Sequence, residues 1–139
     1  MPIHLDIVTP EKKTFSAPVE SVYLPGADGE MGVLPMHAGL VTALKPGVLR
    51  YTENGVESEL AIGSGFAEIG QSVVKVLTDS ALGEDQIDEE QTEAAIKRAE
   101  ERLAGIDHGM DPDEVAYLEN LISRQAAALK FKRRNNPSM

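Results

Sequence analysis

Three histidines are the side chains of this protein best suited to hold a metal ion or to transfer protons. His4 lies in an alternating stretch typical of a strand, His37 in a glycine-punctuated corner, and His108 in a predicted loop. No two of them have HxH or HxxxH spacing, which would place two imidazoles on one face of a strand or helix. Cysteine is absent, which excludes thiolate ligands, cysteine nucleophiles and disulfides and is compatible with a reducing compartment. We therefore expect no metal site and no cofactor.

The other residues that could do chemistry have simpler structural explanations. The serines lie in predicted turns or helices, outside the strand–turn–helix context of a catalytic nucleophile. Gly63, Ser64 and Gly65 resemble a phosphate loop, but they join two predicted strands and do not open a helix. The acidic run from Asp85 to Glu93 precedes and opens a predicted helix, where the helix dipole favours negative charge. The sequence therefore predicts a protein that is not an enzyme.

The stretch from Gly26 to Gly47 is the least ordinary part of the sequence. Glu30, Met31, Pro35 and His37 fall within eight positions of it. The stretch neither alternates like a strand nor is short and polar like a turn, which favours a shaped surface supported by its neighbours. The alternative is a pair of short strands joined by an irregular corner, with His37 bonded to its own turn.

Composition and charge limit the class of protein. With 139 residues and 42% hydrophobic content, the chain can form one domain plus an appendage. Its apolar runs are too short for a transmembrane helix or a signal peptide. The net charge of −10 argues against nucleic acid binding. That charge divides into −7 over residues 1–85, −8 over 86–120 and +5 over 121–139. The basic tail suits a partner with an acidic surface, although solubility alone can explain it.

Up to about Leu82 the chain has the pattern of β-structure. Alternating or apolar runs are separated by turn residues, and Asn54-Gly55 between two of them is a strong hairpin signal. The predicted strands cover 3–8, 19–24, 41–44, 48–52, 56–62, 66–69 and 73–78. Strands at this spacing predict an antiparallel β-sandwich or barrel, and the few aromatic residues require an aliphatic core.

After Gly83 the apolar period becomes helical. Asp88 with Gln91 three residues later is a capping-box arrangement, and Gly105 ends this first helix. Asp111 and Pro112 open a second helix, as a cap and a first-turn residue. Two helices joined by a short loop form an antiparallel hairpin. The predicted fold class is therefore segregated α+β, with a β-sandwich over residues 1–85 and a helical hairpin over 86–139.

The predicted hairpin has few large apolar side chains. The first helix offers mainly alanines with Ile96 and Leu103, and the second includes the run Ala126 to Ala128. Burying a leucine or isoleucine contributes about 1.5–3 kcal/mol and an alanine far less. The hairpin should therefore be marginally stable unless it docks on the sandwich or on a partner. We expect two arrangements of the hairpin, separated by a few kcal/mol.

A resemblance to a known family follows from several of these stretches. GEMGVLPMHAGLVTALKPGVLRY, FAEI, VVKVLTDSA and AAIKRAEERL, in this order, closely resemble the ε subunit of bacterial rotary ATP synthases. The resemblance runs from Ile3 to about Leu103 and more loosely to the end. It implies a ten-stranded β-sandwich followed by two helices. It also implies a non-catalytic, peripheral central-stalk subunit on the cytoplasmic face of the bacterial membrane.

The resemblance also implies roles for residues of the sandwich. Family members hold the γ subunit on one side and meet the polar loops of the membrane c-ring with the other. By its place in the motif, Glu30 would face the c-ring loops. Met31, Pro35 and His37 would shape the stalk interface. The subunit would turn with the rotor and couple proton-driven rotation to the catalytic head.

In this family the helical hairpin is a regulator. It packs on the sandwich or extends along γ into the catalytic head, where basic residues of the second helix meet acidic groups of the α and β subunits and ATP hydrolysis is inhibited. The residues here that match in kind are Arg124, Lys130, Lys132, Arg133 and Arg134. The alternative is that these cations only complement the helix dipole.

Some family members bind ATP between the helices through an Ile-Asp-x-x-Arg-Ala motif. Ile87 and Asp88 match its start, Glu84 and Arg98 match further positions, but Gln91 replaces the arginine. An amide is a poor substitute for a guanidinium in binding phosphate, and Glu89 and Glu90 would repel it. We expect weak or absent ATP binding. The alternative function for the whole chain is a free-standing β-sandwich binding module with a dimerising hairpin.

Overall fold

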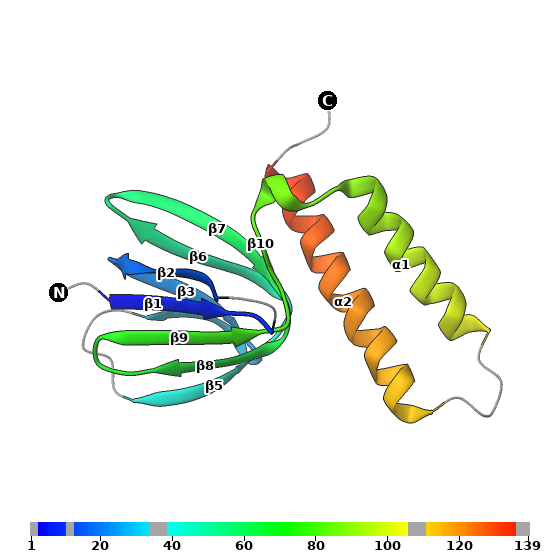
Figure 1. The fold of residues 1–139 in the computed structure, drawn as a ribbon, viewed down its shortest axis with the longest axis horizontal. Coiled ribbons are helices and arrows are strands. Elements are labelled where there is room, and N and C mark those ends of the chain that lie inside the picture. The colour runs from blue at the N-terminus through cyan, green and yellow to red at the C-terminus, as the bar shows by residue number, and fades with distance from the viewer. Residues whose placement is uncertain (1–2, 11–12, 34–38, 106–110, 136–139) are drawn as a thin grey trace.

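A computed structural model describes residues 3–10, 13–33, 39–105 and 111–135, without the side chains of 13, 14 and 135. Over these residues, ten strands form one hydrogen-bonded sheet and two α-helices follow it (Figure 1). The strands are β1 Ile3–Val8, β2 Lys13–Val19, β3 Ser21–Gly26, β4 Gly29–Val33, β5 Leu40–Leu44, β6 Gly47–Glu53, β7 Val56–Ile62, β8 Gly65–Ile69, β9 Val73–Thr78 and β10 Ala81–Leu82. The fold class predicted from the sequence is confirmed.

The sheet curls around an aliphatic core. Its strand order is β10-β7-β6-β3-β5-β8-β9-β1-β2, and β4 pairs with β3 outside this path. Alternate residues of β1, namely Ile3, Leu5 and Ile7, are at most 1% exposed, as are Leu24 of β3 and Leu49 of β6. This alternation results from the two-residue period of a strand, which sends successive side chains to opposite faces.

One strand pairing departs from the antiparallel prediction. β1 runs parallel to β9, whereas the other described pairs are antiparallel. A parallel pair needs a long connection between its strands, and most of the sandwich separates β1 from β9 in the sequence. This pairing joins the beginning of the β region to its end.

The strands that the sequence pattern did not predict are β2, β4 and the two-residue β10. Pro18 falls inside β2, opposite His4 of β1. A proline has no amide proton for the ladder, and it is tolerated here because β2 is the edge strand of the sheet order. β4 contains Glu30 and Met31 and pairs along its whole length with β3. The unusual stretch is thus, where described, a pair of short strands on either side of residues 34–38.

The hairpin between β6 and β7 forms where the sequence placed it. Asn54 and Gly55 both have positive φ, 52° and 79°. Positive φ at both central residues is the requirement of a type I′ turn, whose twist matches that of the flanking strands. The Gly63–Gly65 segment joins β7 to β8, which are not neighbours in the sheet.

The helical part begins with a short 3-10 turn, η1 Glu84–Gln86, followed by α1 Glu89–Ala104 and α2 Pro112–Asn135. The predicted caps are present. Asp88 accepts a hydrogen bond of 2.9 Å from the backbone N–H of Gln91, and Asp111 accepts one of 2.9 Å from that of Asp113. These carboxylates satisfy amide groups that have no partner within the first turn of a helix.

The two helices pack antiparallel, and ion pairs connect them near both ends. Thr92 and Ala99 of α1 are buried, as are Leu118 and Leu129 of α2. At one end Arg102 Nε donates to Glu114 at 2.9 Å. At the other end Arg133 Nε donates to Glu89 at 2.9 Å and its Nη2 contacts Glu93. The buried side chains on α1 are thus small, whereas α2 contributes two leucines.

The hairpin lies against the sandwich through α2, which is placed between the sheet and α1 (Figure 1). Phe131 and Ala128 of α2 form a second apolar cluster with Ala61 of β7 and Ile87, and Val48 and Leu82 pack around it. Phe131 is only 2% exposed. The apolar contact that docks the hairpin is therefore concentrated at the C-terminal half of α2.

Candidate functional surfaces

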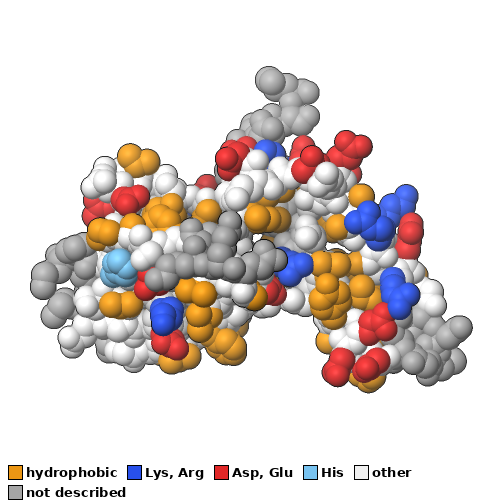
Figure 2. Space-filling model, viewed as in Figure 1, with side chains coloured by type: hydrophobic (Ala, Val, Ile, Leu, Met, Phe, Trp, Pro, Cys, Tyr) orange, Lys and Arg blue, Asp and Glu red, His pale blue; other side chains and the backbone are white. Residues whose placement is uncertain are grey.

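One outward face of the sandwich is apolar. In β8 and β9, Phe66 and Leu77 lie opposite each other in register, and Ala43 of β5 lies opposite Phe66 on the other side. Phe66 is 56% exposed and Val41 of β5 is 66% exposed. We call this surface the apolar strand face; its exposed large side chains are Val41, Phe66, Val73 and Leu77. Figure 2 shows hydrophobic side chains grouped over β5 and β8, at the lower edge of the sheet in that view.

The apolar strand face also carries two charged side chains. Glu68 and Lys75 lie opposite each other across β8 and β9, beside Val41. They border a shallow hollow of about 410 Å³ together with Leu40 and Val73. Exposed large apolar residues grouped on neighbouring strands mark an interaction surface more often than scattered ones do. This surface suits a protein partner with apolar side chains and a few matching charges.

Glu30 lies on β4 as an exposed carboxylate that is held by an arginine. Its Oε1 is 2.7 Å from Nη2 of Arg50 on β6. The Arg50 guanidinium also lies over the Tyr23 ring, 4.7 Å from its centroid, which fixes the direction of the ion pair. Met31 is half-buried against the core, so it supports the strand more than it offers a surface. Pro35 and His37, predicted for the same interface, lie outside the described residues.

Four of the five predicted basic residues of α2 are paired with acids of this same chain. Arg134 Nη2 lies 2.7 Å from Glu59 of β7, and Lys132 Nζ lies 3.6 Å from the carboxylate of Glu84. Arg133 is paired with α1, as described above, and Arg124 Nη1 lies 3.8 Å from Asp79 Oδ2. Lys130 is exposed. The cations are therefore engaged along the docked hairpin.

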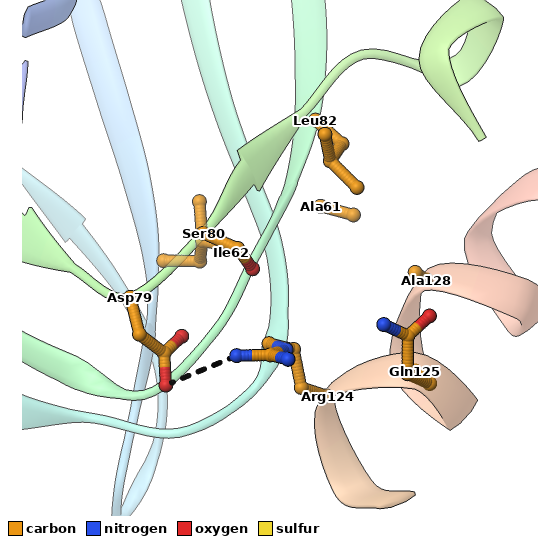
Figure 3. A pocket seen from close by; sticks show the side chains of 8 residues that line it. All are labelled: Ala61, Ile62, Asp79, Ser80, Leu82, Arg124, Gln125 and Ala128. Atoms are coloured by element: carbon orange, nitrogen blue, oxygen red, sulfur yellow. Dashed lines mark ion pairs between the residues drawn. The ribbon is translucent and has the colours of Figure 1, made fainter. Parts of the chain in front are cut away.

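Asp79, in the connection from β9 to β10, was not predicted as a functional residue. Its Oδ2 accepts a hydrogen bond of 3.0 Å from Asn120 Nδ2, while Ser64 donates to Asn120 Oδ1 at 3.0 Å. Figure 3 shows Arg124 reaching from α2 toward Asp79 across a pocket of about 240 Å³. No spacing in the sequence could reveal this group, since Asp79 and Asn120 become neighbours only when α2 docks.

The residues predicted for a nucleotide site are brought only partly together. Asp88 and Arg98 line a hollow of about 500 Å³ between the helices, with Ile87 and Gln91. Ile87, however, is 5% exposed and belongs to the apolar cluster under α2, and Asp88 caps α1. Glu84 is not among the lining residues and is paired with Lys132. Among the lining side chains, Arg98 alone is a cation able to bind phosphate.

The described residues offer neither a metal site nor a membrane-spanning helix. Within the ranges that the structure describes, no three side chains of His, Cys, Asp or Glu are arranged so that they could hold a metal ion. His4 lies on the outside of β1, where its Nε2 is 2.9 Å from Ser16 Oγ; His37 and His108 fall outside those ranges. Among the described helices, none has the length and hydrophobicity to cross a membrane.

Comparison with known proteins supplies the family. Residues 2–84 match the family model described as ATP synthase, Delta/Epsilon chain, beta-sandwich domain. The ATP synthase epsilon chain of Desulforamulus reducens is 54% identical over 99 residues, 71% of this chain and 75% of that relative. The ATP synthase epsilon chain of Herpetosiphon aurantiacus is 38% identical over 96% of this chain and 99% of its own length. The chain belongs to the ATP synthase epsilon family.

Solved structures agree with this family assignment. A chain of the Euglena gracilis mitochondrial ATP synthase, in a structure of OSCP, F1 and c-ring, matches with a TM-score of 0.71 and 25% identity, over 91% of this chain and 78% of that one. A chain of the Tetrahymena thermophila central stalk and c-ring matches with a TM-score of 0.58 at 10% identity, over 95% and 97%. The chain is therefore an ATP synthase epsilon chain by family, and both of these structures share its fold.

Proposed function

We propose that this epsilon chain is a non-catalytic rotor subunit that links c-ring rotation to the catalytic head through γ, and that its helical hairpin restrains ATP hydrolysis. Residues 1–85 form the part that binds the stalk and the c-ring, and residues 86–139 form the regulatory part. The subunit works at the cytoplasmic face of the bacterial membrane and binds ATP weakly or not at all. Family membership favours this function over a free-standing binding module.

The observation that carries the proposal is the apolar strand face. A rotor subunit must stay attached to its shaft while torque passes through it, which requires an extensive, well-packed contact. Phe66 and Val41 are more than half exposed in the isolated chain, and each lies on a rigid strand. We assign this face to the γ subunit. Glu30, held outward by Arg50, is assigned to the polar loops of the c-ring. Met31, Pro35 and His37 are assigned to the stalk interface by their place in the same sequence motif.

Substitutions on the apolar strand face test the assignment to γ. Val41→Glu with Phe66→Glu would bury two unpaired carboxylates in the contact, and we expect the chain to lose co-purification with γ and the catalytic head. Val56→Glu is the matched control, because Val56 is 63% exposed but lies at the β6–β7 turn. Association of the double variant at the wild-type level would contradict the proposal.

The inhibitory role rests on the basic C-terminal half of α2. Once α2 leaves both the sandwich and α1, Arg124, Lys132, Arg133 and Arg134 lose acids of their own chain and become available to acidic surfaces of the catalytic head. Replacing all four with glutamine should relieve inhibition of ATP hydrolysis in the reconstituted enzyme, with association to γ unchanged. Equal hydrolysis rates with the wild-type and the quadruple-variant subunit would show that these cations do not inhibit.

A further inference from the structure

A polar cluster joins α2 to two connections of the sandwich. Ser64 lies in the β7–β8 connection and Asp79 in the β9–β10 connection. The Asn120 side-chain amide bridges them, since its Nδ2 donates to Asp79 at 3.0 Å and its Oδ1 accepts from Ser64 at 3.0 Å. One turn further along α2, Arg124 Nη1 lies 3.8 Å from the same Asp79 carboxylate. An amide and a guanidinium of α2 thus converge on a single carboxylate of the sandwich.

Gly63 makes room for this arrangement. A Cβ at position 63 would lie 1.7 Å from Asp79 Oδ1 and 3.1 Å from Arg124 Cδ. The first distance is far below any non-bonded contact, so only glycine lets the carboxylate rest against the backbone at this point. Asp79 Oδ1 is buried and has no hydrogen-bond partner among the described residues. The carboxylate is therefore held by the groups that α2 supplies to Oδ2, together with Ser64, whose Oγ is 3.4 Å away.

The polar cluster lies at one end of the contact between α2 and the sandwich. An apolar anchor, formed by Ala128 and Phe131, lies further along the helix. Ala128 and Phe131 follow Asn120 and Arg124 along α2 at helical spacing, and Phe131 is buried beside Ile87. Arg134 and Lys132, beyond the anchor, are paired with Glu59 and Glu84. The apolar anchor is thus flanked on both sides by charges that the docked hairpin neutralises.

We propose that Asp79, Asn120 and Arg124 form a clasp that keeps the hairpin docked and, in doing so, withholds Arg124 from any other acidic surface. The second half of this inference rests on the proposed function, in which the released cations act on the catalytic head. Removing the acid of the clasp and removing its cation should therefore have opposite effects on the inhibition of ATP hydrolysis. Loss of Asp79 releases α2 with its cations intact and strengthens inhibition, whereas loss of Arg124 releases α2 with a cation missing.

The clasp itself is tested on the isolated full-length chain, without any partner. The sequence contains no cysteine, so Val56→Cys and Tyr117→Cys accept spin labels at two positions that are both 63% exposed. Pulsed dipolar spectroscopy then measures the fraction of molecules with α2 away from the sandwich. We expect Asp79→Asn and Gly63→Ala each to raise this fraction about tenfold, because a charge-assisted contact is lost or pushed apart.

Matched controls separate the clasp from general effects of substitution. Asp113→Asn removes an exposed carboxylate from α2, and Gly70→Ala adds a Cβ whose nearest neighbour is 3.7 Å away. Neither should change the open fraction. Amide exchange in β1 and β9 shows whether Gly63→Ala has loosened the sandwich, and Asp79→Asn covers that case because it adds no atoms to the site. An unchanged open fraction in Asp79→Asn overturns the clasp.

Hydrolysis by the reconstituted enzyme tests what the clasp withholds. Asp79→Asn should lower the ATP hydrolysis rate and Arg124→Gln should raise it, relative to the wild-type subunit. If the labels report opening in Asp79→Asn while hydrolysis responds to neither substitution, the clasp stands and the inhibitory function is wrong. If Arg124→Gln raises hydrolysis while the labels report no opening in Asp79→Asn, the inhibitory function stands and the clasp is wrong.

Discussion

Glu30 is an exposed side chain whose proposed role in coupling does not require a role in folding. Its side chain is 55% exposed, and its contact with Arg50 is an ion pair at the protein surface. Exposed pairs of this kind contribute about 0–1 kcal/mol. The carboxylate is therefore dispensable for folding of the sandwich. Arg50, which lies over the Tyr23 ring, holds it in a fixed direction, and this makes it suitable for recognising a partner.

We expect Glu30→Lys to uncouple proton flow from ATP synthesis while the sandwich keeps its thermal stability within about 1 kcal/mol. The measurement compares proton pumping and ATP synthesis in membrane vesicles. Arg50→Gln is the matched control, since it breaks the same ion pair but keeps the carboxylate, and it should leave coupling largely intact. Normal coupling in Glu30→Lys would remove Glu30 from the c-ring contact.

The proposed weakness of ATP binding also depends on single residues. Among the side chains that line the hollow between the helices, Arg98 has no second cation beside it and Gln91 is an amide, while Glu84 is engaged by Lys132. Calorimetry should therefore detect no saturable ATP binding in the micromolar range. Gln91→Arg should tighten binding about tenfold or more, because a guanidinium forms charge-assisted bonds with phosphate. Micromolar affinity in the wild-type chain would refute this interpretation.

Among the elements, α2 docks the hairpin, and Phe131 is the larger of the two side chains that α2 contributes to the buried apolar cluster. Replacing a buried phenylalanine with alanine typically costs about 3–5 kcal/mol. Phe131 packs with Ile87 and Ala61 where α2 meets the sandwich, and it does not belong to the sandwich core. Its loss should therefore loosen the hairpin and leave the sandwich folded.

The measurement for Phe131→Ala is amide hydrogen exchange resolved by element. We expect exchange in α1 and α2 to accelerate by about a hundredfold, with β1, β8 and β9 unchanged. Tyr117→Ala is the control, because this aromatic side chain of the same helix is 63% exposed. In the wild-type chain, exchange as slow in the hairpin as in the sandwich would count against a hairpin that opens.

Much of this architecture could be predicted from local patterns. Alternation located most strands, Asn54-Gly55 located a turn, and Asp88 and Asp111 located both helix starts, because each of these signals acts within a few residues. β2 was missed because Pro18 looked like a boundary and is instead tolerated at the sheet edge. The basic residues of α2 were predicted as candidates, but their partners were not. Arg124 and Asp79 are distant in the sequence, and their contact depends on how a whole helix docks.

In the molecule as a whole, the net negative charge opposes the compact state, whereas pairs between the basic segment and the acids support it. The chain has a net charge of −10, and its basic segment, residues 121–139, folds back against acids of the sandwich and α1. Lys132 is 18% exposed and its partner Glu84 41%, so solvent and salt reach these pairs. The docked state is therefore supported partly by ion pairs that salt weakens. The second apolar cluster, around Phe131, also supports it and is insensitive to salt.

Salt should open the hairpin without unfolding the sandwich. Raising sodium chloride from about 0.05 to 1 M shortens the screening length from about 14 to 3 Å, which removes most of the attraction between exposed pairs. We expect the radius of gyration from small-angle scattering to rise over this range, while the thermal midpoint of the sandwich stays nearly constant. Arg134→Gln should flatten the salt response, because Arg134 is paired with Glu59, whereas Lys130→Gln, at an exposed position, should not. A radius that shrinks with salt would mean that repulsion among the acids, and not these pairs, governs the hairpin.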